Sequence, residues 1–186
     1  MTFAMGVPLI IVIWAIISKQ KSITRLLTIY WKITTLIGIS MLLLIDHNQI
    51  GYITLFIAPL LMVSSVWFWV DLNEELEELP QWSGLPLTVR VWRWSLTFYG
   101  VISSIVSIIS LKCLSEVSRS ECSTWNEIPI LIHNTNRIVF GFLFGADWTK
   151  QLASFIGYIL LIFYIVNILQ WLLTKLPKQG RIAGDF

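Results

Sequence analysis

The amino-acid sequence predicts an all-α, polytopic membrane protein with about five transmembrane helices in one domain, residues 1–186. Of its residues 56% are hydrophobic and only 13% are charged, whereas a typical soluble domain has about 25% charged residues. The mean hydropathy is +0.75, and several apolar runs approach the roughly 20 residues that cross a bilayer core about 30 Å thick. The net charge is only +2 and no basic run is present, which excludes a nucleic-acid partner.

Five apolar stretches are the predicted spans, and they cover residues 3–17, 26–45, 51–70, 94–111 and 152–173. The first is short, and positive charges follow it, whereas a signal peptide carries them in front. We therefore expect a short anchor, or a span whose natural start lies upstream of Met1. Lys32 lies near one end of the second span, where its long side chain can reach the membrane surface. Pro59 should kink the third span at its middle.

The distribution of lysine and arginine predicts the orientation of the chain. With five spans, one side of the membrane receives Lys19, Lys21, Arg25, Arg90, Arg93, Lys175, Lys178 and Arg181. The opposite side has a longer total loop length but receives only Lys112, Arg119, Arg137 and Lys150. Because cytoplasmic loops carry the excess of positive charge, the N-terminus is expected outside and the C-terminus in the cytoplasm.

Tryptophans gather at the predicted cytoplasmic face, and they are Trp14, Trp31, Trp67, Trp69, Trp92, Trp94 and Trp171. Indole rings prefer the level of the lipid headgroups, so these residues indicate an aromatic belt. Contact with a pigment is the alternative interpretation.

An acidic segment, residues 71–79, follows the third span on the cytoplasmic side. Leu72, Leu76 and Leu79 recur with helical spacing, and Pro80 ends the segment, so we expect a helix that continues the third span. Its acids are Asp71, Glu74, Glu75, Glu77 and Glu78. They form either a solvated face or a docking surface for a basic partner. They lack the glycine turn and ligand spacing of a calcium loop, so no metal site is predicted.

The longest loop, residues 112–151, is predicted on the outer side and contains Cys113 and Cys122. Disulfides persist in such compartments, and closing a ring of about ten residues contributes on the order of 2–3 kcal/mol in the chain-entropy model. We therefore expect a disulfide between these two cysteines, with two free thiols as the alternative.

The same loop contains an apolar stretch, residues 138–145, which is too short to span the bilayer. It is expected to be an interfacial or re-entrant segment. Gly141 and Gly145 have the spacing of a close helix contact, although both could instead mark turns.

Small and polar residues in two spans indicate helix packing. In the fourth span, small residues at helical spacing predict a packing seam, with a pore lining as the alternative, and they are Gly100, Ser103, Ser104, Ser107 and Ser110. In the last span, Asn167 and Gln170 lie three residues apart. They are expected to bond to a neighbouring helix, or else to line a polar site.

Motifs of catalysis are missing from the sequence. There is no nucleophile elbow, GxGxxG, Walker loop or HExxH. His47 and His133 have no second ligand or nucleophile at useful spacing, so each is interpreted as an ordinary interfacial histidine. We therefore expect no enzyme, no metal and no cofactor.

Four strings carry a resemblance to known sequences, and they are Ile29–Lys32, Trp67–Leu76, Arg90–Trp94 and Leu176–Arg181. Together they resemble a family of uncharacterised multi-span membrane proteins of cyanobacteria and chloroplasts, over nearly the whole chain. The family has no established catalytic or ligand residues that could be carried over. The resemblance implies a thylakoid or plasma membrane of a photosynthetic cell, and an auxiliary role around photosynthetic complexes.

Two hypotheses of function follow. The first is a non-catalytic integral membrane protein that binds or assists the assembly of a larger membrane complex, such as a photosynthetic one. Its partners would be the lipid bilayer and other membrane-protein subunits. The alternative is a small transporter or channel, for which the serines of the fourth span and the polar pair of the last span would supply the polar path.

Overall fold

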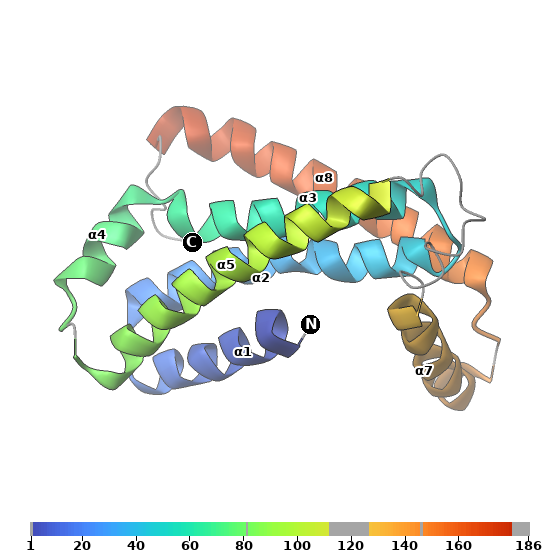
Figure 1. The fold of residues 1–186 in the computed structure, drawn as a ribbon, viewed down its shortest axis with the longest axis horizontal. Helices are drawn as coiled ribbons and strands as arrows, with labels where there is room; N and C mark the ends of the chain where they lie inside the picture. The colour runs from blue at the N-terminus through green and yellow to red at the C-terminus, as the bar shows by residue number, and fades with distance from the viewer. Residues whose placement is uncertain (1, 81, 112–126, 146, 180–186) are drawn as a thin grey trace. The chain divides into compact units, whose positions relative to one another are not determined.

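The computed structural model describes residues 2–80, 82–111, 127–145 and 147–179. In these residues the chain forms seven α-helices and no β-strand (Figure 1), which confirms the all-α class. The helices are α1 (Thr2–Ile17), α2 (Lys21–Leu44), α3 (Gln49–Trp67), α4 (Val70–Glu78), α5 (Gly84–Leu111), α7 (Glu127–Phe144) and α8 (Lys150–Gln179).

Three stretches of the described helices are long and apolar enough to cross a membrane, and they are Lys21–Leu44, Gln49–Trp67 and Lys150–Thr174. They overlap the second, third and fifth of the predicted spans. A shorter apolar helix, Ala4–Ile17, coincides with most of the first predicted span, and α5 contains the fourth. The total of five spans therefore stays a prediction.

The chain divides into two compact units. The first unit consists of Met1–Thr34, Pro59–Ile102 and Leu169–Phe186. The second unit consists of Thr35–Ala58 and Ser103–Ile168. In the first unit the apolar core includes Leu26, Leu72 and Leu96, all fully buried. In the second unit a core cluster surrounds Ile45, Trp148 and Ala153.

The acidic helix α4 does not continue α3, contrary to the expectation from the sequence. Trp69 adopts an extended backbone with φ −87° and ψ 112°, and α4 turns away from the end of α3 (Figure 1). The Asn73 side-chain amide donates a hydrogen bond to the Trp67 carbonyl oxygen at 3.1 Å. That carbonyl at the end of α3 has no partner within its own helix, so the asparagine stabilises the break.

Helix α7 also departs from the prediction, because it lies inside the segment 112–151 that was expected to be a loop. The apolar stretch 138–145 is mostly the C-terminal part of this helix of 18 residues. Gly145 ends α7 with φ +64°, and its amide donates to the Gly141 carbonyl oxygen at 3.0 Å. An added Cβ at either glycine would meet no atom within 4 Å. Gly145 is therefore a helix cap, and this pair does not form a close helix contact.

Many hydroxyl groups in the candidate spans are bonded within their own helix. Thr28 and Thr34 of α2 each donate to the carbonyl oxygen four residues earlier at 2.8 Å. Ser64 of α3 and Thr174 of α8 do the same, at 2.8 and 2.7 Å. Such bonds satisfy the polar group without help from a neighbouring helix.

Cys113 and Cys122 lie in the segment 112–126, outside the described residues. The disulfide between them stays a prediction.

Candidate functional site

Helix α4 packs against the rest of the first unit through its leucines. Leu72 and Leu76 are 0% and 1% exposed, and Leu79, which follows the helix, is half-buried. These leucines have the periodicity of one helical face. Because that face is buried, the residues on the opposite side of α4 are the ones that remain available to other molecules.

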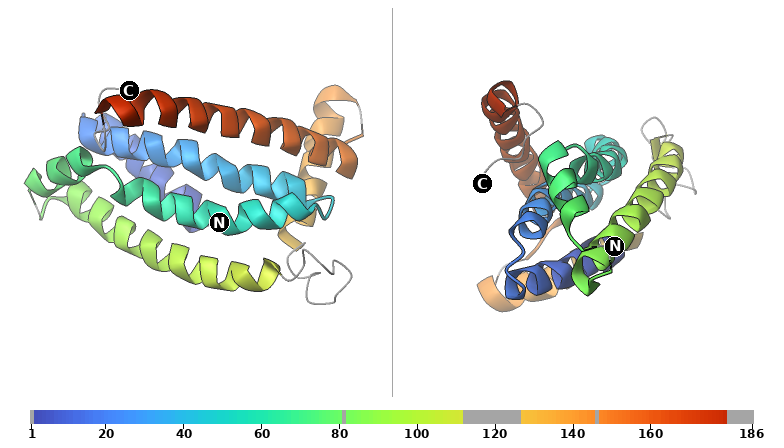
Figure 2. Two further views of the ribbon diagram at one scale, coloured as in Figure 1. Left: turned by 90° about the horizontal axis from the view of Figure 1, so that it is seen from above. Right: turned by 90° about the vertical axis from the view of Figure 1, so that its left-hand side faces the viewer.

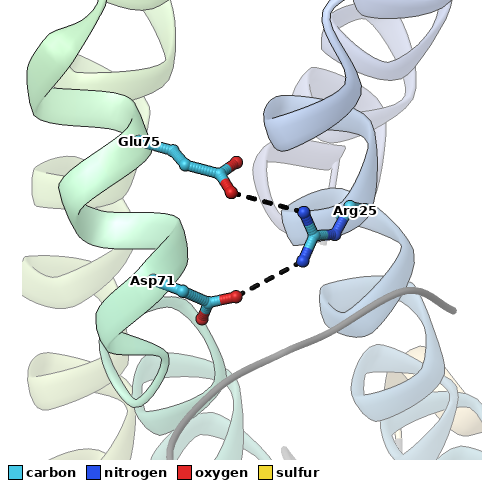
Figure 3. A network of polar contacts seen from close by, with 3 residues as sticks. All are labelled: Arg25, Asp71 and Glu75. Carbon is cyan, nitrogen blue, oxygen red and sulfur yellow. Dashed lines mark hydrogen bonds and ion pairs between the residues drawn. The ribbon is translucent and has the colours of Figure 1, made fainter.

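Arg25 of α2 reaches two acids of α4 (Figure 3). Its Nη2 atom lies 3.3 Å from Asp71 Oδ2, and its Nη1 atom lies 3.4 Å from Glu75 Oε1. The sequence predicted five acids that face water or a partner, and two of them, Asp71 and Glu75, pair with Arg25 of the same chain while they stay partly exposed. The three side chains are partly exposed, so each ion pair contributes about 1 kcal/mol or less.

Two arginines of α5 hold α4 from another side. Arg90 donates from Nη2 to the Leu76 carbonyl oxygen at 2.9 Å, near the end of α4. Arg93 donates from Nη2 to the Val66 carbonyl oxygen at 2.6 Å and also to Asn73 Oδ1. We call Arg25, Arg90 and Arg93, with their partners Asp71, Asn73 and Glu75, the arginine clasp.

Arg93 is the most buried member of the arginine clasp, with 5% of its surface exposed. Its guanidinium carbon lies 4.1 Å from the centre of the Trp67 ring, a cation–π geometry. Burial lowers the pKa of Arg93 to about 10, and the negative charge of Glu77 opposes this shift. The side chain is therefore charged at neutral pH, and its hydrogen bonds are the strong, charge-assisted kind.

Three acids of α4 are exposed and lie opposite the leucines, and we call Glu74, Glu77 and Glu78 the acidic face. Their spacing of three and four residues places them on one side of the helix. Trp82, which follows α4 in the chain, is 89% exposed. The arginine clasp thus fixes α4 while it leaves the acidic face free for an interaction with a basic surface.

The tryptophans of the predicted belt do not all face lipid headgroups. Trp69 and Trp92 are 3% and 2% exposed, whereas Trp14 and Trp94 are 42% and 58% exposed. The buried rings make edge contacts inside the first unit. Trp92 meets Tyr30 with ring centres 5.0 Å apart, and Trp69 meets Trp171 at 5.1 Å. The buried tryptophans therefore pack the unit, and the belt stays a prediction for the exposed ones.

The predicted packing residues of α5 and α8 differ in how far they are buried. Gly100 is buried, and Ser104 and Ser107 are 8% and 2% exposed. Ser103 is half-buried, and the side chain of Ser110 lies outside the described residues. Asn167 and Gln170 are exposed, and the Asn167 amide donates to the Phe163 carbonyl oxygen of its own helix at 2.7 Å. Within the residues that the structure describes, this polar pair is therefore not placed against a neighbouring helix.

Neither histidine takes part in a cluster of chemical groups. His47 is exposed, in the turn between α2 and α3 with φ +54°, and His133 is 9% exposed. Among the described residues, no group of three or more His, Cys, Asp or Glu side chains could hold a metal ion. The arginine clasp and the acidic face are thus the charged groups that remain as a candidate functional site.

The sequence did not reveal the arginine clasp. Arg25, Arg90 and Arg93 entered the sequence argument only as positive charges that set the orientation. Arg25 lies 46 and 50 residues from its two acids, so no local spacing signals the contact. The signal that could have found it is weaker: Arg25 precedes the second predicted span, and Arg90 and Arg93 precede the fourth, all on the same predicted side of the membrane as the acidic segment.

A comparison with protein families matches residues 1–184 to the model of a family described as "Protein of unknown function (DUF3177)". No curated protein and no solved structure matches the chain.

Proposed function

We propose that this chain, which belongs to the protein family of unknown function DUF3177, is a non-catalytic membrane protein that binds or helps assemble a larger membrane complex. The observation that carries the proposal is the acidic face, Glu74, Glu77 and Glu78, on a helix fixed by the arginine clasp. The partner is a membrane-protein subunit with a basic surface near the membrane.

The attachment of α4 to the rest of the first unit supports this role. A short helix of nine residues is only marginally stable in water on its own. Buried leucines and three arginines hold it in one place, so binding a partner would cost little further conformational entropy. A helix that served only to increase solubility would not need this attachment. The acids left exposed then supply long-range attraction and specificity toward a positive surface.

The topology and the location are part of the proposal. The excess of lysine and arginine supports five spans with the N-terminus outside and the C-terminus in the cytoplasm. In that arrangement the acidic face is cytoplasmic. The resemblance of four sequence strings to proteins of cyanobacteria and chloroplasts supports a thylakoid or plasma membrane of a photosynthetic cell.

Neutralising the acidic face should weaken association with the partner. The triple variant Glu74→Gln, Glu77→Gln, Glu78→Gln removes three exposed charges and leaves the buried leucines and the described hydrogen bonds and ion pairs of the clasp in place. We expect normal insertion and thermal stability, but a several-fold lower yield of partner subunits on purification from native membranes in mild detergent. Quantitative mass spectrometry of the purified material measures this loss.

The matched control is Glu127→Gln with Asp147→Asn, which removes exposed acids of the second unit. This control should retain the partner. Equal recovery of all subunits with the triple variant and the control would contradict the proposed role of α4. Recovery of the wild-type chain alone, with thermal stability that depends on an added solute, would instead favour the transporter hypothesis.

The topology predicts labelling from opposite sides of the membrane. We expect a thiol reagent that cannot cross membranes to modify Glu127→Cys in intact cells when the chain is expressed in the plasma membrane of a bacterial host, in a background with Cys113→Ser and Cys122→Ser. Glu78→Cys should react only after the membrane is opened. Both positions are exposed, so reaction of both from the same side would show that the proposed orientation is wrong.

A further inference from the structure

Helix α7 presents three different sides, and one of them is an exposed apolar surface. One side is packed: Pro129 and His133 are buried, and Phe140 is half-buried. A second side is exposed and carries the polar residues Asn134 and Arg137, with Ile130 between them. At 100° per residue, the third side lies between these two, and its apolar members are Ile128, Leu131, Ile138, Val139 and Phe142. We call this third side the apolar stripe.

The apolar stripe is strongly exposed. Its members Leu131, Ile138 and Phe142 are 66%, 71% and 89% exposed. A soluble surface rarely shows so many large apolar side chains together. Thr135, the polar residue within the stripe, donates its hydroxyl to the Leu131 carbonyl oxygen at 3.0 Å. Its polar group is thus satisfied within the helix, and it does not interrupt the apolar character of this side.

The packing of the second unit fixes α7 where two candidate spans end. The ring of Phe140 lies 5.1 Å from that of Trp148, and Phe140 packs against the core cluster of Ile45, Trp148 and Ala153. Ile45 follows the last residue of α2, and Ala153 lies in the first turn of α8. The ends of membrane spans lie at the membrane surface, so α7 is held at that level.

The direction of α7 agrees with this position. Figure 2 shows α7 running across the direction of the first half of α8, not alongside it. A helix that runs across a span lies roughly in the plane of the bilayer. A spanning role does not fit its sequence, because Arg137 and the polar run His133–Asn136 lie at its centre. An arginine at the centre of a span costs about 2.5–3.5 kcal/mol.

We propose that α7 is an interfacial helix, with the apolar stripe inserted among lipid acyl chains and Asn134 and Arg137 directed toward water and headgroups. Helices with one apolar and one polar exposed side bind the bilayer in this way. The occupant of the stripe is therefore lipid, the same environment that the adjoining candidate span, Lys150–Thr174, would have. The inference does not depend on the role of the acidic face.

Spin labels on α7 test the position of each side. In the background without cysteines, Phe142→Cys and Leu131→Cys report on the apolar stripe, and Asn134→Cys and Arg137→Cys are matched controls on the same helix. In proteoliposomes, the ratio of collisions with oxygen to collisions with a water-soluble nickel chelate should be several-fold higher for the first pair. Equal ratios for the two pairs would overturn the proposal.

A second measurement uses the unmodified protein, so its result does not depend on whether the cysteine variants fold. A photoreactive probe carried on a lipid chain should label the peptide that contains Ile138, Val139 and Phe142. Absence of that label, with strong labelling of α8, would show that something other than lipid covers the stripe. Protection of Phe142→Cys from both oxygen and nickel would identify a protein contact and would equally overturn the proposal.

Discussion

Replacing Arg93 with methionine should cause the largest loss of stability of any single change in the arginine clasp. The variant removes the donor to the Val66 carbonyl oxygen and to Asn73 Oδ1, and the cation above the Trp67 ring. Hydrogen bonds of a charged group contribute about 1.5–3 kcal/mol, and loss of one partner leaves the other unsatisfied. We expect the free energy of unfolding to fall by on the order of 3 kcal/mol, measured by thermal or denaturant unfolding in detergent.

Two further variants make this prediction specific. Arg90→Met removes an arginine that is less buried and that donates to backbone carbonyl groups near the end of α4, so its effect should be about 1 kcal/mol. Arg93→Lys keeps the charge but loses the planar group that stacks on Trp67, so its stability should lie between those of wild type and Arg93→Met. If Arg93→Met were as stable as Arg90→Met, the buried guanidinium would not be holding α3, α4 and α5 together.

Substituting Gly100 with alanine should also destabilise the first unit. An added Cβ would lie 2.4 Å from Val63 Cγ2 and 3.4 Å from the Pro59 carbonyl oxygen. Valine is stiff at χ1, so α5 must move away from α3 to admit the methyl group. Overpacking of this kind costs about 1–3 kcal/mol. We expect a lower melting temperature, and partial recovery when Val63→Ala is added.

Gly38→Ala is the control for this substitution, because an added Cβ there meets no atom within 4 Å. It should be neutral or stabilising by up to about 1 kcal/mol, since alanine favours the helix. Equal melting temperatures for the two alanine variants, or no recovery with Val63→Ala, would contradict the close approach of α5 to α3 at Gly100.

The sequence predicted those features that depend on short-range patterns. The helical class follows from apolar runs of membrane length. The leucine spacing of 71–79 indicated a helical face, and Leu72 and Leu76 are indeed buried. The break at Trp69 was missed because no proline or glycine marks it. Asn73 bonds to the Trp67 carbonyl oxygen there and stabilises the break, a contact that the sequence pattern does not reveal.

Features that depend on distant residues were not predicted. The pairing of Arg25 with Asp71 and Glu75 joins residues on different helices, and the sequence contains no local trace of it. Helix α7 was missed for another reason. Its polar centre interrupts the apolar run, so only part of it appeared as an apolar stretch. The helical pattern of α7 becomes clear only from the structure, in which Pro129 and His133 are buried on one side of the helix and Phe142 is exposed on another.

The hydroxyl bonds within the candidate spans bear on how the protein enters its membrane during synthesis. Thr28, Thr34, Ser64 and Thr174 each satisfy their hydroxyl on a carbonyl oxygen four residues earlier, so none of these groups waits for a later helix. These four hydroxyl groups therefore add little to the cost of placing a candidate span in lipid before its neighbours are present. Arg93 differs, because the acceptors given by Val66 and Asn73 belong to a segment synthesised before it. Both acceptors are therefore already synthesised when Arg93 is added to the chain.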